Sequence, residues 1–168
     1  MLDRHRPWIT CLVVAAAIGV AMPAASQTVL LVVRENVDSD PLPPPFPVRE
    51  GLSNGLFDAG VIVLDAPGTE RMPATAEAVR LATAAGAEAV VEVATVYADT
   101  TLQKDLVRIA ARTTWTILDA ATSRTIGSGT EEATNRDREK EIDRLALGGE
   151  IGRKLAAQVK RLLDLRGS

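Results

Sequence analysis

The side chains that most often carry enzyme chemistry are confined to the first 26 residues. The chain has one histidine, His5, and one cysteine, Cys11, and both lie there. We predict that residues 1–26 are a cleaved export signal, so the folded remainder would contain neither side chain. That remainder could not build a Ser-His-Asp triad, a cysteine nucleophile, a thiolate or imidazole metal site, a disulfide or a haem ligand set. The sequence therefore assigns no catalytic, cofactor-binding or metal-binding residue, and no cofactor.

Carboxylates remain as candidates for acid–base chemistry, as in glycoside hydrolysis. Glu92 stands out because its neighbours in the sequence are apolar, and burial would raise the pKa of its carboxyl. The alternative is a structural carboxylate that pairs with Arg108 or Arg112 on the next predicted strand. We favour this structural interpretation.

Two other clusters suggest ligands but lack the required context. Four carboxylates could supply oxygen atoms to calcium: Glu35, Asp38, Asp40 and Glu50. The glycine and the terminal glutamate of a calcium-binding loop are missing from this stretch. The Gly-rich stretch of residues 148–152 superficially resembles a phosphate cradle. A helical pattern precedes it, whereas such cradles follow a strand. We interpret the first cluster as a solvated acidic loop and the second as part of a helix.

The leader has the three parts of a secretory signal peptide. A basic start at residues 4–6 precedes an uncharged run from Trp8 to Ala21, which is short for a membrane span of about 20 residues. Pro23 and the small residues that follow it predict cleavage after Ser26 and a periplasmic or secreted product. The alternative is an uncleaved anchor from Trp8 to Ala25. Cys11 lacks the preceding residues of a lipid-modified cysteine.

Charge argues against a nucleic-acid partner. The whole chain has 19 basic and 22 acidic residues, a net charge of −3, and loss of the leader would make it more acidic. A nucleic-acid-binding domain needs a basic footprint, which this composition lacks.

The spacing of apolar residues predicts one α/β domain over residues 27–168, with the order β-α-β-α-β-β-β-α and a mixed sheet of about five strands. The expected strands are Thr28–Arg34, Val61–Asp65, Glu88–Ala98, Asp105–Asp119 and Thr125–Thr134. The expected helices are Val48–Ala59, Ala74–Ala85 and Glu141–Arg166. A stripe on the last helix should pack on the sheet: Leu147, Ile151, Leu155, Val159 and Leu162.

Three connections are expected to be polar or irregular. Prolines make residues 35–47 a stiff loop, which we interpret as a connector rather than a partner-binding segment, with Phe46 tucked into the core. Residues 99–104 should form a polar connection, and residues 135–140 a solvated charge run. One face of the long strand at 105–119 should be wet, with Arg108, Arg112, Thr114 and Thr116 on it.

Two short motifs resemble those of known envelope proteins. Gly86-Ala87-Glu88 precedes Val91, and Asp119-Ala120-Ala121-Thr122 forms a predicted hairpin turn. In these motifs the chain resembles the small periplasmic α/β domains of the curli-secretion lipoprotein, of the TolB amino terminus and of the penicillin-binding-protein activator lipoproteins. The resemblance implies a non-enzymatic envelope domain that binds other proteins. The anchoring cysteine and the membrane hairpins of the curli pore are missing here, so no functional residue is carried over.

The sequence thus favours an exported, non-enzymatic adaptor or accessory factor whose partner is another envelope protein. Two alternatives remain open. A carboxylate-dependent hydrolase acting on cell-wall or extracellular glycans requires two carboxylates in one cleft. A small-ligand binding module requires an apolar pocket under the proline loop.

Overall fold

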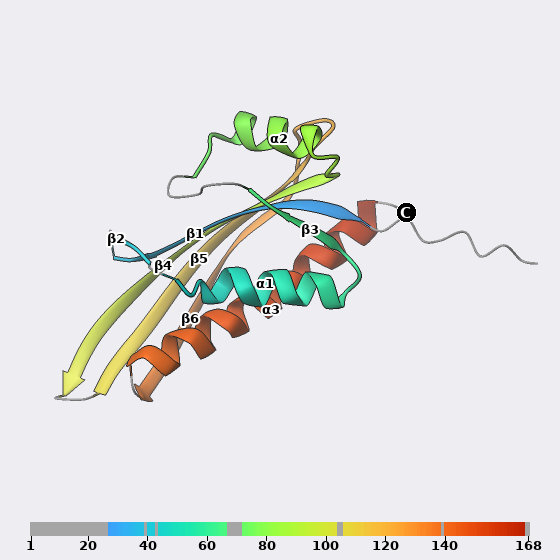
Figure 1. Ribbon diagram of the computed structural model, residues 1–168. Coiled ribbons are helices and arrows are strands. Elements are labelled where there is room, and N and C mark those ends of the chain that lie inside the picture. Colours follow the sequence, from blue (N-terminus) through green and yellow to red (C-terminus); the bar gives the residue numbers. More distant parts are fainter. Residues whose placement is uncertain are drawn as a thin grey trace, which may run out of the picture.

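The computed structural model describes residues 27–38, 40–42, 44–66, 72–103, 106–138 and 140–166 (Figure 1). The predicted leader, residues 1–26, lies outside the described residues. The elements in chain order are β1 (Thr28–Val37), β2 (Asp40–Pro41), α1 (Pro47–Asp58), β3 (Ile62–Asp65), α2 (Thr75–Ala84), β4 (Ala89–Gln103), β5 (Leu106–Asp119), β6 (Thr125–Arg138) and α3 (Lys140–Arg166). The predicted mixed α/β class is confirmed, with the two-residue β2 as the one added strand.

The strands form one six-stranded mixed sheet in the order β2-β1-β4-β5-β6, and β3 also pairs with β1. Strand β1 is parallel to β3 and β4, because helices α1 and α2 carry the chain back across the sheet. Strands β4, β5 and β6 then form an antiparallel meander. The first half of the chain is therefore built from crossovers and the second half from hairpins.

The structure corrects three predicted connections. Strand β1 continues to Val37, so residues 35–37 are strand rather than loop, and Asp40–Pro41 adds the short β2. Residues 99–103 belong to β4, and residues 135–138 belong to β6. Polar composition suggested loops in these segments. The backbone instead follows the antiparallel ladder, where hydrogen bonds between main-chain groups are satisfied whatever the side chain.

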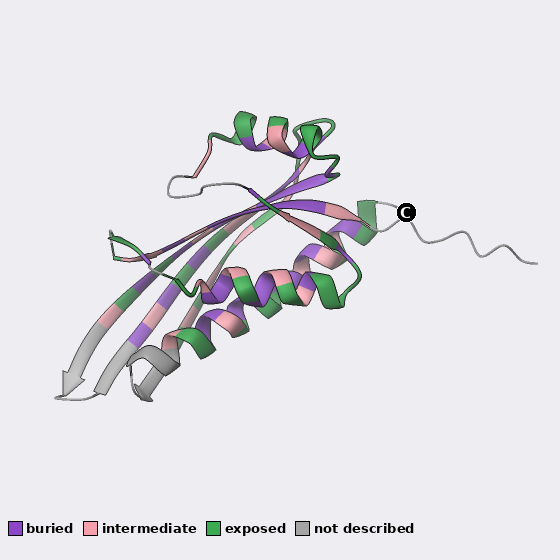
Figure 2. Ribbon diagram, in the orientation of Figure 1, coloured by how far each residue is buried: buried purple, intermediate pink, exposed green. Residues whose placement is uncertain are grey.

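Helices cover both faces of the sheet, but unequally (Figures 1 and 2). Helices α1 and α3 lie on one face and enclose the larger core, in which Tyr97 is the largest fully buried side chain. The smaller α2 lies on the other face, over a second cluster around Leu30, Val32 and Val90. Beyond α2 that face is wet: Arg112 and Thr114 are exposed and Thr116 is half-buried. The predicted solvent-exposed face of this strand is confirmed at Arg112 and Thr114, while Arg108 lies outside the described side chains.

The apolar stripe of α3 is buried as predicted at its first four positions. Leu147, Ile151, Leu155 and Val159 belong to the larger core. The stripe then continues through Leu163, four residues after Val159, and Leu162 is only partly buried.

The glycines of α3 allow close approach to α1 and, at Gly148, to the sheet, where an added Cβ would lie 2.5 Å from the hydroxyl oxygen of Tyr97. A Cβ added to Gly51 of α1 would lie 2.5 Å from the carbonyl oxygen of Gly149. A Cβ added to Gly152 would lie 2.5 Å from the amide nitrogen of Leu52. The two helices therefore touch backbone to backbone, because glycine has no Cβ to hold them apart. The phosphate-cradle interpretation of residues 148–152 has no support in this arrangement.

Candidate binding groove between helices α1 and α3

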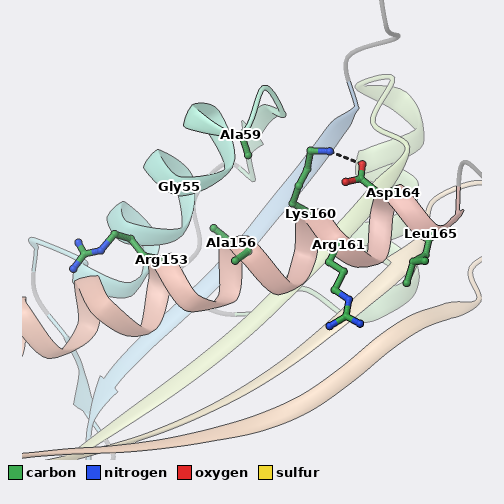
Figure 3. Close-up of a pocket in the computed structure, with 9 residues that line it drawn as sticks. Gly55, Ala59, Arg153, Ala156, Lys160, Arg161, Asp164 and Leu165 are labelled. Atoms are coloured by element: carbon green, nitrogen blue, oxygen red, sulfur yellow. Dashed lines mark hydrogen bonds and ion pairs between the residues drawn. The ribbon is translucent and has the colours of Figure 1, made fainter.

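An open groove lies where the C-terminal half of α1 diverges from α3 (Figure 3). We call it the α1–α3 groove. Its volume is about 560 Å³. The residues that line it are Gly55, Ala59, Arg153, Ala156, Ala157, Lys160, Arg161, Asp164 and Leu165. Two properties distinguish this surface: small side chains at its floor and positive charge along α3.

Small residues let the helices meet at the narrow end of the α1–α3 groove. Gly55 faces Ala156, and a Cβ added to Gly55 would lie only 2.7 Å from the Cβ of Ala156. Farther along, Ala59 and Ala157 are exposed, so the groove opens without large side chains to fill it. Any molecule that enters the opening therefore meets a shallow, apolar surface.

The charged residues of the groove are not equivalent. Lys160 forms an ion pair and a hydrogen bond with Asp164, and this hydrogen bond lowers the pKa of the Asp164 carboxyl. Gln27, at the start of the described chain, also donates to Asp164 at 3.3 Å. Arg153 and Arg161 are exposed and form no ion pair within 4 Å of any residue that the structure describes. Arg153 nevertheless adds to the effect of Lys154 in lowering the pKa of the Glu150 carboxyl.

Four exposed residues follow one another along α3 at intervals of four: Arg153, Ala157, Arg161 and Leu165. At 3.6 residues per turn each step rotates the side chain by about 40°, so the first and the last of them lie about 120° apart around the helix. Leu165 is 66% exposed, which is unusual for a leucine in this structure. Figure 3 shows Arg161 and Leu165 on the same side of the helix, pointing away from α1.

A buried carboxylate fixes the start of α1, which forms one wall of the groove. Glu35 is 3% exposed and accepts a hydrogen bond from the Tyr97 hydroxyl at 2.9 Å. It also accepts the backbone N–H groups of Val48 and Arg49, at 3.2 and 3.0 Å. These are among the unpaired donors of a helix N-terminus, where a negative charge is favoured. Burial nevertheless raises the pKa of the Glu35 carboxyl, and these hydrogen bonds oppose that shift only in part.

Tyr97 connects this carboxylate to α3. The guanidinium carbon of Arg144 lies 5.9 Å from the centre of the Tyr97 ring, within the range of a cation–π contact. Arg144 also forms an ion pair with Asp99 at 2.6 Å. Burial, with Glu35 alongside, raises the pKa of the Tyr97 hydroxyl, so it stays protonated and donates to Glu35. The start of α1 is therefore bound to β1 through Glu35, and α3 is bound to β4 through the contacts of Arg144.

The acidic-loop interpretation is thus wrong for Glu35, although Asp38, Asp40 and Glu50 are exposed as expected. Glu35 follows Val29, Leu31 and Val33 in the alternation of β1, and all three are buried. The same alternation in the sequence indicates that the Glu35 side chain is buried. The predicted strand ends at Arg34, so Glu35 was assigned to the loop instead. Among the residues that the structure describes, no group of three or more histidine, cysteine or acidic side chains is placed to hold a metal ion.

Glu92 lies in β4 on the face that α2 covers in part, and it is half-buried. Burial raises the pKa of its carboxyl, and Thr75 at the start of α2 opposes the shift. Its cross-strand neighbours are Val32 and Thr116, which carry no carboxylate. These neighbours give the hydrolase interpretation no second acid. Arg112, which was a predicted partner of Glu92, instead forms an ion pair with Glu132 of β6, with 3.6 Å between its Nε atom and the Glu132 Oε1 atom.

The prediction that Phe46 is tucked into the core is wrong. Phe46 is half-buried at the start of α1 and lines a small hollow of about 230 Å³ beside the proline loop. The other lining residues are polar or charged: Arg49, Glu50, Ser53, Asn54 and Asp65. Arg49 and Asp65 form an ion pair at 3.1 Å across it. The hollow is therefore not the apolar pocket that a small-ligand module would require.

The comparisons with known proteins identify the fold. No protein-family model matches the sequence, and no curated protein matches it. Among solved structures, the PelC dodecamer from Paraburkholderia phytofirmans is 16% identical, with a TM-score of 0.53 over 76% of this chain and 87% of that chain. The hypothetical protein CT253 from Chlamydia trachomatis is 16% identical, with a TM-score of 0.57 over 81% of this chain and 96% of that chain.

A third solved structure, protein XCC0632 from Xanthomonas campestris, is 11% identical, with a TM-score of 0.54 over 88% of this chain and 91% of that chain. At these identities the likeness establishes a shared fold. Within the described residues, no helix combines the length and apolar character needed to cross a membrane.

Proposed function

We propose that this chain is an exported, non-enzymatic accessory protein of the cell envelope, and that it acts by binding another protein through the α1–α3 groove. The observation that carries the proposal is the groove itself. The groove is lined by small side chains, two exposed arginines and the exposed Leu165. Exposed apolar residues next to arginines are typical of protein-binding surfaces.

Two further observations support the proposal. The sequence after residue 26 contains no histidine or cysteine, which removes the imidazole base and the thiol nucleophile. PelC, which has the same fold, was solved as a dodecamer and therefore uses this architecture for contacts between proteins. We extend that mode of action, binding through protein surfaces, to the present chain.

The experiment compares two tryptophan variants in a pull-down from an envelope extract of the native host. Ala157→Trp would fill the opening of the α1–α3 groove, because Ala157 is exposed and lines it. Ala84→Trp is the matched control, since Ala84 is an exposed alanine at the end of α2 on the opposite face of the sheet. We expect a defined protein to be recovered with the wild type and with Ala84→Trp, and lost with Ala157→Trp. Equal recovery with both variants would contradict the proposed surface.

We also propose that cleavage after Ser26 releases residues 27–168 as a single periplasmic or secreted domain. The uncharged run, the proline and the small residues before position 27 support this site. Mass spectrometry of the protein from its native host would measure the amino terminus. A chain that begins at Gln27 is expected, and a chain that begins at Met1 in a cytosolic fraction would overturn the export proposal.

A further inference from the structure

The two outer edges of the sheet differ in their chemistry. Strand β6 forms one edge, and charged residues such as Glu131 and Glu132 lie along it, which discourages pairing with a further strand. Strand β3 lies at the other edge, beside β1, and three of its four residues are apolar. Among the described residues, its strand partner is β1. An apolar strand therefore stands at an edge of the kind that natural proteins usually protect.

Half of the backbone groups of β3 face away from β1. The N–H of Ile62 donates to the carbonyl oxygen of Gln27 at 2.8 Å, at the start of the pairing with β1. Successive residues of a strand direct their N–H and C=O groups to opposite edges. The N–H and C=O groups of Val63 and Asp65 therefore point to the outer edge of β3. Their direction suits pairing with one further strand.

Exposed apolar side chains flank this edge on both faces of the sheet. Val63 packs against the larger core on the α1 side, and Leu64 packs against the smaller cluster on the α2 side. Ile62 shares the face of Leu64, because it is two residues away, and it is 46% exposed. On the α1 side, Phe57 is 75% exposed. Its carbonyl oxygen accepts the N–H of Gly60, two residues before Ile62, so Phe57 lies near the start of β3.

The opposite end of β3 borders an acidic hollow. Arg49, at the start of α1, pairs with Asp65, at the end of β3, so the helix and the strand run in opposite directions. This pair and Phe46 line the hollow of about 230 Å³ described above. Glu50, which also lines it, is exposed and forms no ion pair with any residue that the structure describes. A lysine that entered the hollow could lay its methylene groups on Phe46 and direct its ammonium group to Glu50.

We propose that β3 accepts an extended segment of another protein as an additional strand, with apolar side chains beside Phe57 and Ile62 and a basic side chain in the hollow at Glu50. Opposite Val63 and Asp65, the added strand would carry an apolar and a basic residue, two positions apart on the α1 face. This edge is separate from the α1–α3 groove, because the hollow and the groove share no lining residue. The inference therefore adds a second binding surface and does not depend on the groove.

A second copy of this chain fits the edge less well. Antiparallel pairing of all four residues of two β3 strands would set Asp65 of each copy against Ile62 of the other. That arrangement moves a carboxylate from water to apolar neighbours, which is unfavourable. Strand β3 also contains no basic residue to enter the hollow. Charge complementarity therefore favours a different protein with a basic side chain at that position.

The test uses a peptide of serine, lysine, three valines, lysine and serine, whose sequence reads the same in both directions and so suits either direction of pairing. A second peptide has glutamate in place of both lysines. Binding to the purified, isotope-labelled protein is followed by NMR, together with hydrogen exchange of the backbone amides. The protein variants are Phe57→Ala and Glu50→Gln. Their matched controls are Leu165→Ala, at an exposed leucine of the groove, and Glu77→Gln, at an exposed glutamate in the first turn of α2 as Glu50 is in α1.

We expect the lysine peptide to bind and to slow the exchange of the Val63 and Asp65 amides, because a paired N–H is protected. Phe57→Ala should weaken binding about tenfold, and Glu50→Gln about threefold, relative to their controls. Equal binding of the lysine and glutamate peptides would overturn the inference, as would unchanged exchange at both amides in the bound state or no binding at millimolar peptide. Protection of these amides that grows with protein concentration, without peptide, would assign the edge to a second copy and would equally overturn it.

Discussion

The contact between α1 and α3 leads to a prediction in which the same substitution has opposite effects at two neighbouring glycines. Gly149 and Gly152 both lie inside α3, where replacing glycine by alanine favours the helix by about 1 kcal/mol. At Gly149 an added Cβ would meet only the end of the flexible Arg153 side chain, at 3.5 Å. At Gly152 it would meet the backbone of α1, at Leu52 and Val48. Backbone atoms cannot move aside as a side chain can.

The expected loss of stability at Gly152 follows from the distances between the added Cβ and the backbone of α1. An added Cβ at Gly152 would lie 2.5 Å from the Leu52 nitrogen, while ordinary contact begins near 3.4 Å, so the helices must separate by about 1 Å. Overpacking of this kind costs about 3 kcal/mol, which exceeds the gain of about 1 kcal/mol in helix propensity. We therefore expect Gly152→Ala to lower the free energy of unfolding by about 2 kcal/mol, and Gly149→Ala to raise it by up to about 1 kcal/mol.

Thermal and urea unfolding, followed by circular dichroism, would measure both variants against the wild type. For a domain of this size, about 4 °C of Tm corresponds to 1 kcal/mol, so Gly152→Ala should melt about 8 °C lower. Gly149→Ala should melt at or above the wild-type temperature. A Gly152→Ala protein as stable as the wild type would refute the backbone contact between the helices. Equal losses at both positions would refute the assignment of that contact to Gly152.

Three further predictions concern the polar contacts. Tyr97→Phe removes the hydroxyl that donates to Glu35, and should lower the free energy of unfolding in urea by about 2 kcal/mol; an unchanged value would contradict the buried hydrogen bond. The pKa of the Glu35 carboxyl is raised in the folded state above its ordinary value of 4.5, so the native state holds the proton longer than the unfolded chain does. Stability from this group should therefore be greatest below pH 4.5 and fall as the pH rises through the raised pKa, and a Glu35→Gln variant with the same pH profile as the wild type would refute this. The Asp119 carboxylate accepts the Thr122 N–H at 2.7 Å and pairs with Arg166, which keeps its pKa low; Asp119→Ala should cost about 1 kcal/mol at neutral pH, and the difference from the wild type should vanish as acid protonates Asp119.

Much of the fold could be predicted from the spacing of apolar residues, because burial on one face dictates it. The alternation of β5 and the first four positions of the α3 stripe placed the correct residues in the core. Positive φ angles at Gly60 and Gly86 explain why glycines follow the ends of α1 and α2. These are local signals, and each can be read from a few neighbouring residues.

The missed features depend on residues that are distant in the sequence. Gly51 and Gly152 are about one hundred positions apart, and only the assembled fold shows that each is needed where two backbones meet. Glu35 appeared to belong to a solvated loop because its partners, Tyr97 and the start of α1, come later in the chain. Polar residues at the ends of β4 and β6 concealed strands that the pairing with β5 continues. The groove itself could not be predicted, because its walls come from separate helices.

Photo-cross-linking in the native host would test the central claim, that this protein acts through the α1–α3 groove, most directly. A benzophenone amino acid would replace Ala157 in the groove or, separately, Ala84 on α2, both of which are exposed. We predict a discrete adduct with one envelope protein from position 157 and none from position 84. A discrete adduct from position 84, with none from position 157, would contradict the claim.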